Sequence, residues 1–395
     1  MILQNNKKVN PIRNSSDIIS NGVKILLTGG GTGGSVSPLL AVVEELTSPQ
    51  PSPSKGEGAI RRGEKYEFLW VGTKSGPERE MVERTGIKFI AMPAGKLRRY
   101  FSLKNFLDPF KIIVAFFKSF FIILKWRPDL VMTAGSFVSV PVIWAAWILR
   151  VPILVHQQDA RSGLANKLMA PFARVITITF SESLPVYGKK AVWTGNPIQL
   201  SINNYQLSIE EIYKKFDFKK DLPIVLIVGG GTGAMEINKL VWESLDELTK
   251  FCQIVHVTGK GKEVSELSSE ASELSSYYKS FEFLEHEKVM EIMKAADLVV
   301  SRAGLGFLTE ISYLAKPAIL IPIPSSHQED NAQVFAKNEA AIVLDQKKLT
   351  NQDFTNKIKE LLADDVLRNM LRNKVGEVMK KGANEEIARI VERIT

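Results

Sequence analysis

The chain carries one glycine-rich phrase twice, about 200 residues apart. Residues 24–34 read KILLTGGGTGG, and residues 224–234 read IVLIVGGGTGA. In each copy an apolar, β-branched run ends in glycines and a helical pattern follows. Glycines at such a turn let backbone N–H groups approach a ligand closely, and the N-terminus of the next helix favours negative charge. The repeat therefore predicts two similar α/β units, each with an anion-binding loop.

Short apolar runs alternate with helical patterns through both halves of the chain. The first series includes VKILLT, YEFLWVGT, DLVMTAG and RVITITF, and the second includes PIVLIVGG, CQIVHVTG, FEFLEH and ADLVVSRAG. Such alternation is typical of βαβ units and parallel sheets. The pattern predicts an α/β protein, with each of these runs as a strand.

Two domains are expected, because 395 residues exceed what one hydrophobic core usually holds. Residues 1–22 are interpreted as a disordered leader. Residues 23–200 form the first Rossmann-like domain, with a flexible Pro- and Ser-rich insertion at 47–65. Residues 201–395 form the second, and the last helix is expected to pack back onto the first domain.

Composition narrows the class of protein. The single cysteine, Cys252, excludes an internal disulfide framework, and no His/Cys cluster has the spacing of a zinc site. Residues 1–195 hold 26 Lys and Arg against 13 Asp and Glu, whereas the remainder holds 25 against 30. A basic half of +13 joined to a half of −5 indicates an anionic partner. No nucleic-acid motif accompanies the charge, so nucleic acid is not expected.

The segment 104–125 combines a lysine stripe with apolar residues. Lysines recur every seven residues, and nearly everything else after Pro109 is Phe, Ile, Val, Leu or Ala. A membrane span needs about 20 largely apolar residues, and the lysines interrupt this run too often. Two readings stay open: a crossover helix with solvated lysines, or an apolar patch resting on an anionic membrane surface. The candidate membrane residues are Arg98, Arg99, Phe101, Lys111 and Lys118.

The first glycine phrase also contains G-x-G-x-x-G, which would suit a nicotinamide cofactor. That fingerprint requires an acidic residue about 20 positions later, at a strand end. The Pro/Ser-rich insertion occupies that region here, so a dehydrogenase is disfavoured. Two facing loops suit a diphosphate compound and an acceptor bound between two domains.

The run at residues 296–335 gives a more specific signal. A strand ends at Ser301, and a glycine-bearing turn leads into a helix that carries Glu310. A second strand then brings Gln328 and Asn331 to the same edge of the sheet. A carboxylate can accept both hydroxyls of a ribose, and the two amides can hydrogen-bond a neighbouring sugar.

The motifs together resemble the MurG family, the UDP-GlcNAc transferases that convert lipid I to lipid II. The matching segments, in the family's order, are TGGGTGGSVSP, GKLRRYFS, AGSFVSVP, HQQDARSGLANKL, TGNPI, VGGGTGA, SRAGLGFLTE and HQEDNA. The resemblance implies the GT-B fold, in which two Rossmann-like domains face a cleft. It also implies a metal-independent, inverting hexosyltransferase of peptidoglycan synthesis without a cofactor, peripheral on the cytoplasmic face of the bacterial inner membrane. Its partners would be UDP-GlcNAc, a polyprenyl-diphosphate-linked acceptor and the anionic membrane surface.

The resemblance also assigns substrate contacts, residue by residue. Contacts to the sugar and diphosphate are implied for the first loop, phosphate contacts for the second, a uracil contact for one backbone position, and ribose and GlcNAc contacts for the later helices. The implied substrate-binding residues are Thr32, Gly33, Gly34, Asp159, Gln199, Gly230, Gly231, Leu284, Leu305, Gly306, Phe307, Leu308, Thr309, Glu310, Gln328 and Asn331.

The chain departs from the family where catalysis is expected. Ser35 stands where members usually have a histidine that is a leading general-base candidate. Gln157 replaces a glutamate, Asp159 an asparagine, Gln199 an arginine and Gly231 a serine. A serine hydroxyl is no base at neutral pH, so another group must accept the proton of the attacking hydroxyl.

We expect Asp159 or His156 to take this catalytic role. For His156, a histidine satisfied by neighbouring groups is an equally good interpretation. A paralogue that binds nucleotide sugar or lipid with weak catalysis, and a transferase of another sugar, remain alternatives.

Overall fold

The computed structural model describes residues 22–31, 33–48, 66–93, 104–199, 207–230, 233–262 and 276–395, with the side chains of 104–109 left aside. Several expectations fall outside this part of the chain. They are the leader at 1–22 apart from Gly22, most of the insertion at 47–65, and the residues Thr32, Arg98, Arg99, Phe101 and Gly231.

The first domain is built on a seven-stranded parallel sheet with the order β3-β2-β1-β4-β5-β6-β7. Its strands are β1 (Val23–Thr28), β2 (Tyr66–Thr73), β3 (Lys88–Met92), β4 (Leu130–Thr133), β5 (Ile153–Gln157), β6 (Val175–Ile178) and β7 (Ala191–Trp193). Its helical segments are η1 (Gly33–Ser35), α2 (Ser37–Thr47), α3 (Glu78–Glu83), α4 (Lys104–Trp126), α5 (Ser139–Ile148), α6 (Leu164–Met169), η3 (Ala170–Phe172), η4 (Ser181–Ser183), α7 (Leu184–Tyr187) and η5 (Gly188–Lys190).

The sheet is buried on both faces, which explains why its strands read as continuous apolar runs. Along β1, Ile25 and Leu27 pack into one core with α2, whereas Leu26 packs into the opposite core. Alternate side chains of a strand point to opposite faces, so one strand serves both cores.

The second domain repeats this plan with six parallel strands in the order β10-β9-β8-β11-β12-β13. The strands are β8 (Ile224–Val228), β9 (Gln253–Val257), β10 (Tyr278–Phe281), β11 (Leu298–Ser301), β12 (Ala318–Leu320) and β13 (Ile342–Val343). The helices are α8 (Ile209–Lys215), α9 (Met235–Glu243), α10 (Leu245–Leu248), α12 (His286–Ala295), α13 (Leu305–Tyr313), α14 (His327–Lys337), α15 (Asn351–Ala363), α16 (Asp365–Val378) and α17 (Ala383–Ile394).

The two-domain α/β prediction is confirmed, but one strand was misplaced. The run FEFLEH at 281–286 was expected to be a strand, and only Phe281 belongs to β10. Residues 282–285 form a loop with Phe283 exposed to solvent, and His286 begins α12. The strand therefore begins three residues earlier than the apolar run predicted, at Tyr278, and ends where the run begins.

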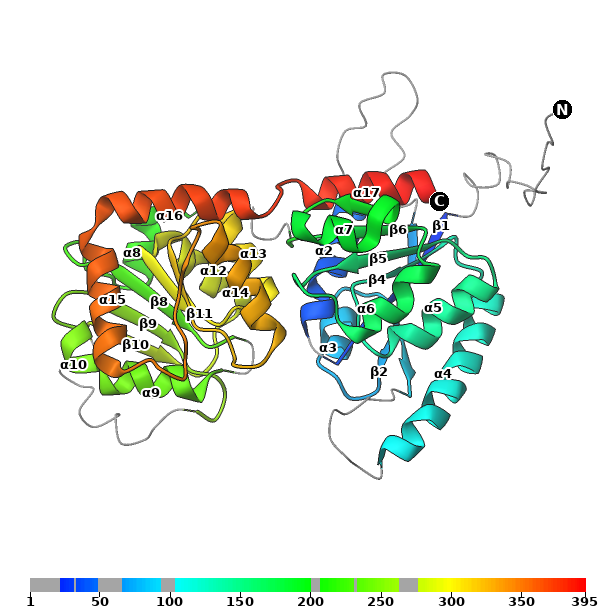
Figure 1. Cartoon of the computed structure of the whole chain (residues 1–395), viewed down its shortest axis with the longest axis horizontal. Helices are drawn as coiled ribbons and strands as arrows, with labels where there is room; N and C mark the ends of the chain where they lie inside the picture. The colour runs from blue at the N-terminus through cyan, green and yellow to red at the C-terminus, as the bar shows by residue number, and fades with distance from the viewer. Residues whose placement is uncertain are drawn as a thin grey trace, which may run out of the picture.

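In each sheet the strand order reverses beside the first strand, between β1 and β4 and between β8 and β11. Ligands of open α/β sheets bind outside the carboxyl ends of strands at this switch point. The two sheets lie next to each other in the molecule (Figure 1). The glycine phrases follow β1 and β8, so each loop begins at the switch point of its own sheet.

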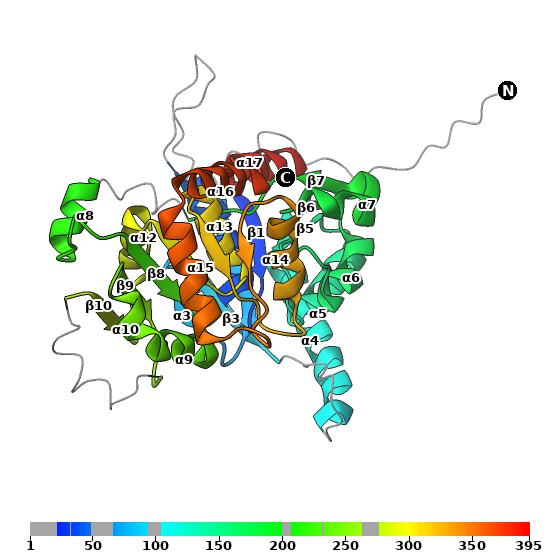
Figure 2. The ribbon, with the colours of Figure 1, turned by 60° about the vertical axis from the view of Figure 1, so that its left-hand side comes forward.

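The last helix returns to the first domain. Helix α17 packs on α2, and Ile387, Ile390 and Val391 enter the core that contains Ile25 and Leu27. In both views α16 lies over the second domain and α17 continues over the first (Figures 1 and 2). The chain thus crosses between the domains twice, near residue 200 and near residue 380.

Gly195 lies where the two crossings meet, and its replacement by alanine is expected to destabilise the fold by at least about 2 kcal/mol. Its φ is +81°, and an added Cβ would lie 2.0 Å from the carbonyl oxygen of Lys380. Gly86→Ala is the matched control, because Gly86 has a φ of +78° and open space around it. Urea unfolding of both variants separates the clash from the backbone strain. Equal losses of unfolding free energy would contradict the expectation.

Helix α4 is apolar on two faces. Ala115 and Ile123 are buried against the first domain, where α4 packs on α5. The opposite side exposes large apolar side chains, namely Phe110, Ile113, Val114, Phe117, Phe121 and Leu124. The helix is therefore a crossover helix, as the first reading predicts, and its outer side is an apolar surface. No described helix combines the length and apolar character that a membrane span requires.

Candidate functional site

A cleft of about 560 Å³ lies between the carboxyl ends of the two sheets. The first glycine loop contributes Gly30 and Gly34 to its wall, and the second contributes Gly229, Gly230 and Gly233. The expectation that both loops face one cleft is confirmed for these residues. Gly33 lies in the same loop as Gly34 but does not line the cleft.

Glycine is required at particular points of these loops. A Cβ on Gly30 would lie 2.3 Å from Oε1 of the buried Glu78, and one on Gly233 would lie 2.2 Å from the carbonyl oxygen of Thr258. Gly233 also has a φ of +68°, a conformation that L-residues adopt only with strain. Because these glycines have no side chains, the backbone of each loop can line the cleft directly.

Arg302 is a cleft residue that the sequence motifs did not single out. It follows β11 directly, lines the cleft and is only 8% exposed. Its Nη1 donates to the carbonyl oxygens of Ile321 and Pro322, at 2.9 and 3.3 Å. Burial lowers the pKa of Arg302 from its usual value, although the group stays cationic at neutral pH. The signal that could have revealed it is a cation placed directly after the buried run LVVS.

Three polar atoms on the cleft wall lack a hydrogen-bond partner within the described part of the chain. They are the Oγ of Ser35, the Oδ1 of Asn166 and the Nε of Arg302. All three residues are more than nine-tenths buried. A buried polar group without a partner is costly, so such atoms on a cleft wall mark places where a ligand would bind.

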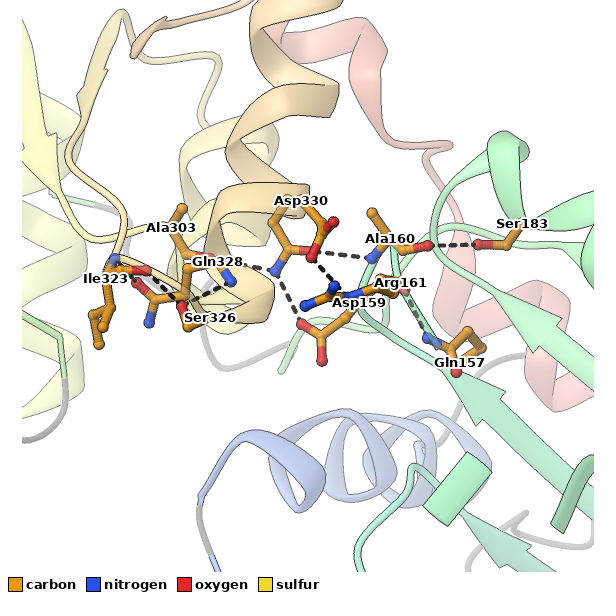
Figure 3. A network of polar contacts seen from close by, with 11 residues as sticks. Gln157, Asp159, Ala160, Arg161, Ser183, Ala303, Ile323, Ser326, Gln328 and Asp330 are labelled. Carbon is orange, nitrogen blue, oxygen red and sulfur yellow. Dashed lines mark hydrogen bonds and ion pairs between the residues drawn. The ribbon is translucent and has the colours of Figure 1, made fainter. Parts of the chain in front are cut away.

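Asp159 lies at the cleft on the loop after β5 and meets the second domain there. Its Oδ1 accepts a hydrogen bond of 2.9 Å from Nδ2 of Asn331, and the next residue, Ala160, donates its N–H to Oδ1 of Asn331 at 2.9 Å. Arg161 Nε lies 3.0 Å from Oδ2 of Asp330 (Figure 3). Asp159 therefore faces the cleft from a segment that is fastened to both domains.

Gln328 and Asn331, near the start of α14, were both expected to bind sugar, but only one of them lines the cleft. Gln328 lines the cleft, as a sugar ligand should, and its Oε1 accepts from the N–H of Ile323. Asn331 was expected to bind sugar as well, and this is corrected. It is 0% exposed, and its amide is used by Asp159, Ala160 and the carbonyl oxygen of Ala303. Asn331 joins the domains and does not line the cleft.

His156 is not placed as a general base, and that expectation is also corrected. The residue is 1% exposed, and its Nδ1 and Nε2 lie 2.9 Å from Thr177 Oγ1 and from Asn196 Oδ1. Burial lowers the pKa of His156 to about 4, so the ring is neutral at physiological pH. Asn196 in turn donates to Oγ1 of Thr309 in the second domain. His156 thus supports a contact between the domains and does not line the cleft.

The segment 305–310 reaches the cleft only in part. Leu305, Gly306 and Phe307 line it, whereas the side chains of Leu308 and Thr309 are buried. Glu310, the implied ribose ligand, is paired with His286, whose Nε2 lies 2.8 Å from its Oε1. This hydrogen bond raises the pKa of His286.

Two further expected contacts lie away from the cleft wall. Leu284 packs partly buried against the core of the second domain. Gln199 lines a separate pocket of about 110 Å³ near the crossing at residue 380, so its expected position in the substrate cleft is corrected. Across the described residues, no three His, Cys, Asp or Glu side chains gather as metal ligands would.

Family models match both domains. The model of the glycosyltransferase family 28 N-terminal domain matches residues 25–178, and that of the C-terminal domain matches residues 224–391. Together they cover most of the chain and the strands on both sides of the cleft.

Relatives and solved structures agree with this match. A protein of Clostridium kluyveri named UDP-N-acetylglucosamine–N-acetylmuramyl-(pentapeptide) pyrophosphoryl-undecaprenol N-acetylglucosamine transferase is 37% identical over 94% of this chain and 99% of its own length. A Clostridium tetani protein of the same name is 38% identical over 86% of this chain and 89% of its own.

Among solved structures, MurG of Acinetobacter baumannii has a TM-score of 0.71 at 22% identity, covering 94% of this chain and 99% of its own. At that identity the likeness supports the fold alone. The two family models and the two relatives go further, and together they show that the chain is a glycosyltransferase and belongs to glycosyltransferase family 28.

Proposed function

We propose that the protein transfers GlcNAc from UDP-GlcNAc to the 4-hydroxyl of the MurNAc unit in undecaprenyl-diphosphate-MurNAc-pentapeptide, converting lipid I to lipid II. One observation carries this proposal: the cleft has a carboxylate, Asp159, on one wall and a buried cation, Arg302, with a glycine loop on the other. The names of the relatives supply the donor and acceptor.

The cleft provides a proton acceptor for the attacking hydroxyl and positive charge for the departing UDP. The acceptor hydroxyl oxygen forms a bond to C1 of GlcNAc, and its proton passes to the carboxylate of Asp159. The bond between C1 and the diphosphate oxygen breaks on the opposite face, so the configuration at C1 inverts. The electron pair leaves with UDP, whose added negative charge meets Arg302, the N–H groups of the second loop and the N-terminus of α13.

The proposal includes transfer without a divalent metal. Arg302 and the loop amides supply positive charge at the place where a metal would otherwise be needed. Undiminished turnover in EDTA is the expected result. Loss of turnover that magnesium restores would contradict this part of the proposal.

Transfer of radiolabelled GlcNAc to synthetic lipid I in detergent tests the proposal directly. We expect label in a lipid product, stoichiometric release of UDP, and a β-anomeric linkage by NMR. UDP binding with little or no transfer would instead support a paralogue that binds nucleotide sugar with weak catalysis. The replacement of the usual histidine by Ser35 favours that alternative. A donor screen identifies a transferase of another sugar.

The exposed face of α4 supports a peripheral position on the cytoplasmic face of the inner membrane. Six large apolar side chains lie exposed on this helix, and Phe121 is 64% exposed. Lys111 and Lys118 lie on the same helix, and Nζ of Lys118 reaches the carbonyl oxygen of Ala91. An apolar face with lysines beside it suits an anionic lipid surface.

Replacing Phe117 and Phe121 together by aspartate is expected to weaken binding to phosphatidylglycerol vesicles by at least about tenfold. Each phenyl ring buried in lipid contributes about 1.5–3 kcal/mol when burial is complete. Val366→Asp on α16 is the control, since Val366 is an exposed apolar residue, more exposed than either phenylalanine, that lies in the second domain. Vesicle co-sedimentation measures both variants. Unchanged binding of the double variant would place the membrane contact elsewhere.

A further inference from the structure

Gln157 lies at the centre of a buried hydrogen-bond network beside the cleft. Its Oε1 accepts from Nδ2 of Asn166 at 2.6 Å and from the hydroxyl of Tyr187 at 3.0 Å. Its Nε2 donates to the backbone carbonyl oxygen of Asp159 at 2.6 Å. The side chain is 2% exposed, so these three contacts determine the orientation of its amide.

Asp159 is thereby held at two points. Gln157 binds its backbone carbonyl within the first domain (Figure 3), and Asn331 of the second domain binds one oxygen of its carboxylate. We propose that Gln157 is a positioning residue for Asp159, because its amide fixes the backbone from which the carboxylate faces the cleft. The inference rests on the proposed role of Asp159 as the general base.

The hydrogen bond that Gln157 donates to the carbonyl oxygen of Asp159 distinguishes glutamine from the glutamate that family members usually carry at this position. An ionised glutamate would still accept from Asn166 and Tyr187, but its second oxygen would face the carbonyl oxygen of Asp159. Two acceptors repel each other, whereas a protonated carboxyl group would restore the donated hydrogen bond. Burial favours the protonated form of a carboxyl group. Gln157→Glu should therefore behave like the wild type at low pH and lose its hold on Asp159 as pH rises.

The test is the ratio of wild-type kcat to variant kcat between pH 6 and pH 8. For Gln157→Glu we expect a ratio that grows by about tenfold over this range, the usual consequence of losing one buried hydrogen bond. Gln157→Leu lacks the donor at every pH, so its ratio should be raised and independent of pH. KM for UDP-GlcNAc should change little in either variant, because Gln157 positions the base and not the donor.

Gln253→Glu is the matched control. Gln253 in β9 is buried to the same extent, and its Nε2 donates to the carbonyl oxygens of Lys219 and Leu222, away from the cleft. The same chemical change there should leave the kcat ratio flat with pH. A flat ratio for Gln157→Glu, an equal pH dependence in Gln253→Glu, or an effect confined to KM would each overturn the inference.

Hydrogen exchange of the peptide 157–163, followed by mass spectrometry on the full chain, gives a readout that needs no turnover. Compared with wild type at the same pH, Gln157→Glu should exchange faster at pH 8 and alike at pH 6. Unchanged exchange at pH 8 would overturn the inference. A wild-type protein that transfers no GlcNAc refutes the proposed function instead, and the exchange result still decides whether Gln157 holds the loop.

Discussion

Replacing Arg302 by alanine is expected to lower kcat for GlcNAc transfer by about 100- to 1,000-fold, the range found when one group that stabilises developing charge is removed. The departing UDP gains negative charge in the cleft, and Arg302 is a cation buried on its wall. The guanidinium is fixed by the carbonyl oxygens of Ile321 and Pro322, while its Nε has no partner in the described part of the chain. A charge oriented before the reaction needs no reorganisation when the bond breaks.

Two further variants separate charge from architecture. Arg302→Lys keeps the charge, but its single nitrogen cannot bind the carbonyl oxygens of Ile321 and Pro322 and also place a donor at the position of the guanidinium Nε, so we expect an intermediate loss of kcat. Lys316→Met is the matched control, because Nζ of Lys316 likewise donates to two backbone carbonyl oxygens, those of Lys294 and Ala296, outside the cleft. That variant should lose stability and keep its kcat. Wild-type kcat in Arg302→Ala would remove Arg302 from the leaving-group site.

Local patterns in the sequence determined the parts of the fold that were predicted well. The glycine phrases, the alternation of strands and helices, and the cleft positions of Gln328 and Leu305 follow from short stretches with a fixed geometry. A glycine turn after a buried strand has few alternatives in a parallel sheet. These features can therefore be predicted without knowing which side chains pack against them.

Burial depth could not be predicted in the same way. Both faces of β5 are covered, so His156 and Gln157 are both buried and alternation along the strand carries no information. Gln328 and Asn331 lie one turn apart on α14, yet one lines the cleft and the other contacts the first domain. The difference arises from how the two domains meet, which no local pattern encodes. Arg302 was missed for the same reason: its place directly after a strand is visible in the sequence, but its burial on the cleft wall depends on how the surrounding segments pack.

Of the two general-base candidates predicted from the sequence, His156 and Asp159, only Asp159 is in a position to accept a proton. His156 has both ring nitrogens engaged and stays neutral, while Asp159 presents its carboxylate at the cleft. Only one of its oxygens accepts the hydrogen bond from Asn331, so the other can meet the acceptor hydroxyl. Under the proposed mechanism, the aspartate that replaces the family's usual asparagine at this position would take over the role of the histidine that Ser35 replaces.

Asp159→Asn should therefore lower kcat by about 100- to 10,000-fold, the usual contribution of a positioned general base. Asparagine keeps the shape of the side chain and can still accept from Asn331, so UDP affinity by calorimetry should be close to that of the wild type. Asp330→Asn is the control, because it removes a neighbouring carboxylate that pairs with Arg161 and does not line the cleft. An equal loss of kcat in both variants would show that the carboxylates act by holding the domains together. A large loss confined to Asp159→Asn, with donor binding intact, would assign proton transfer to Asp159.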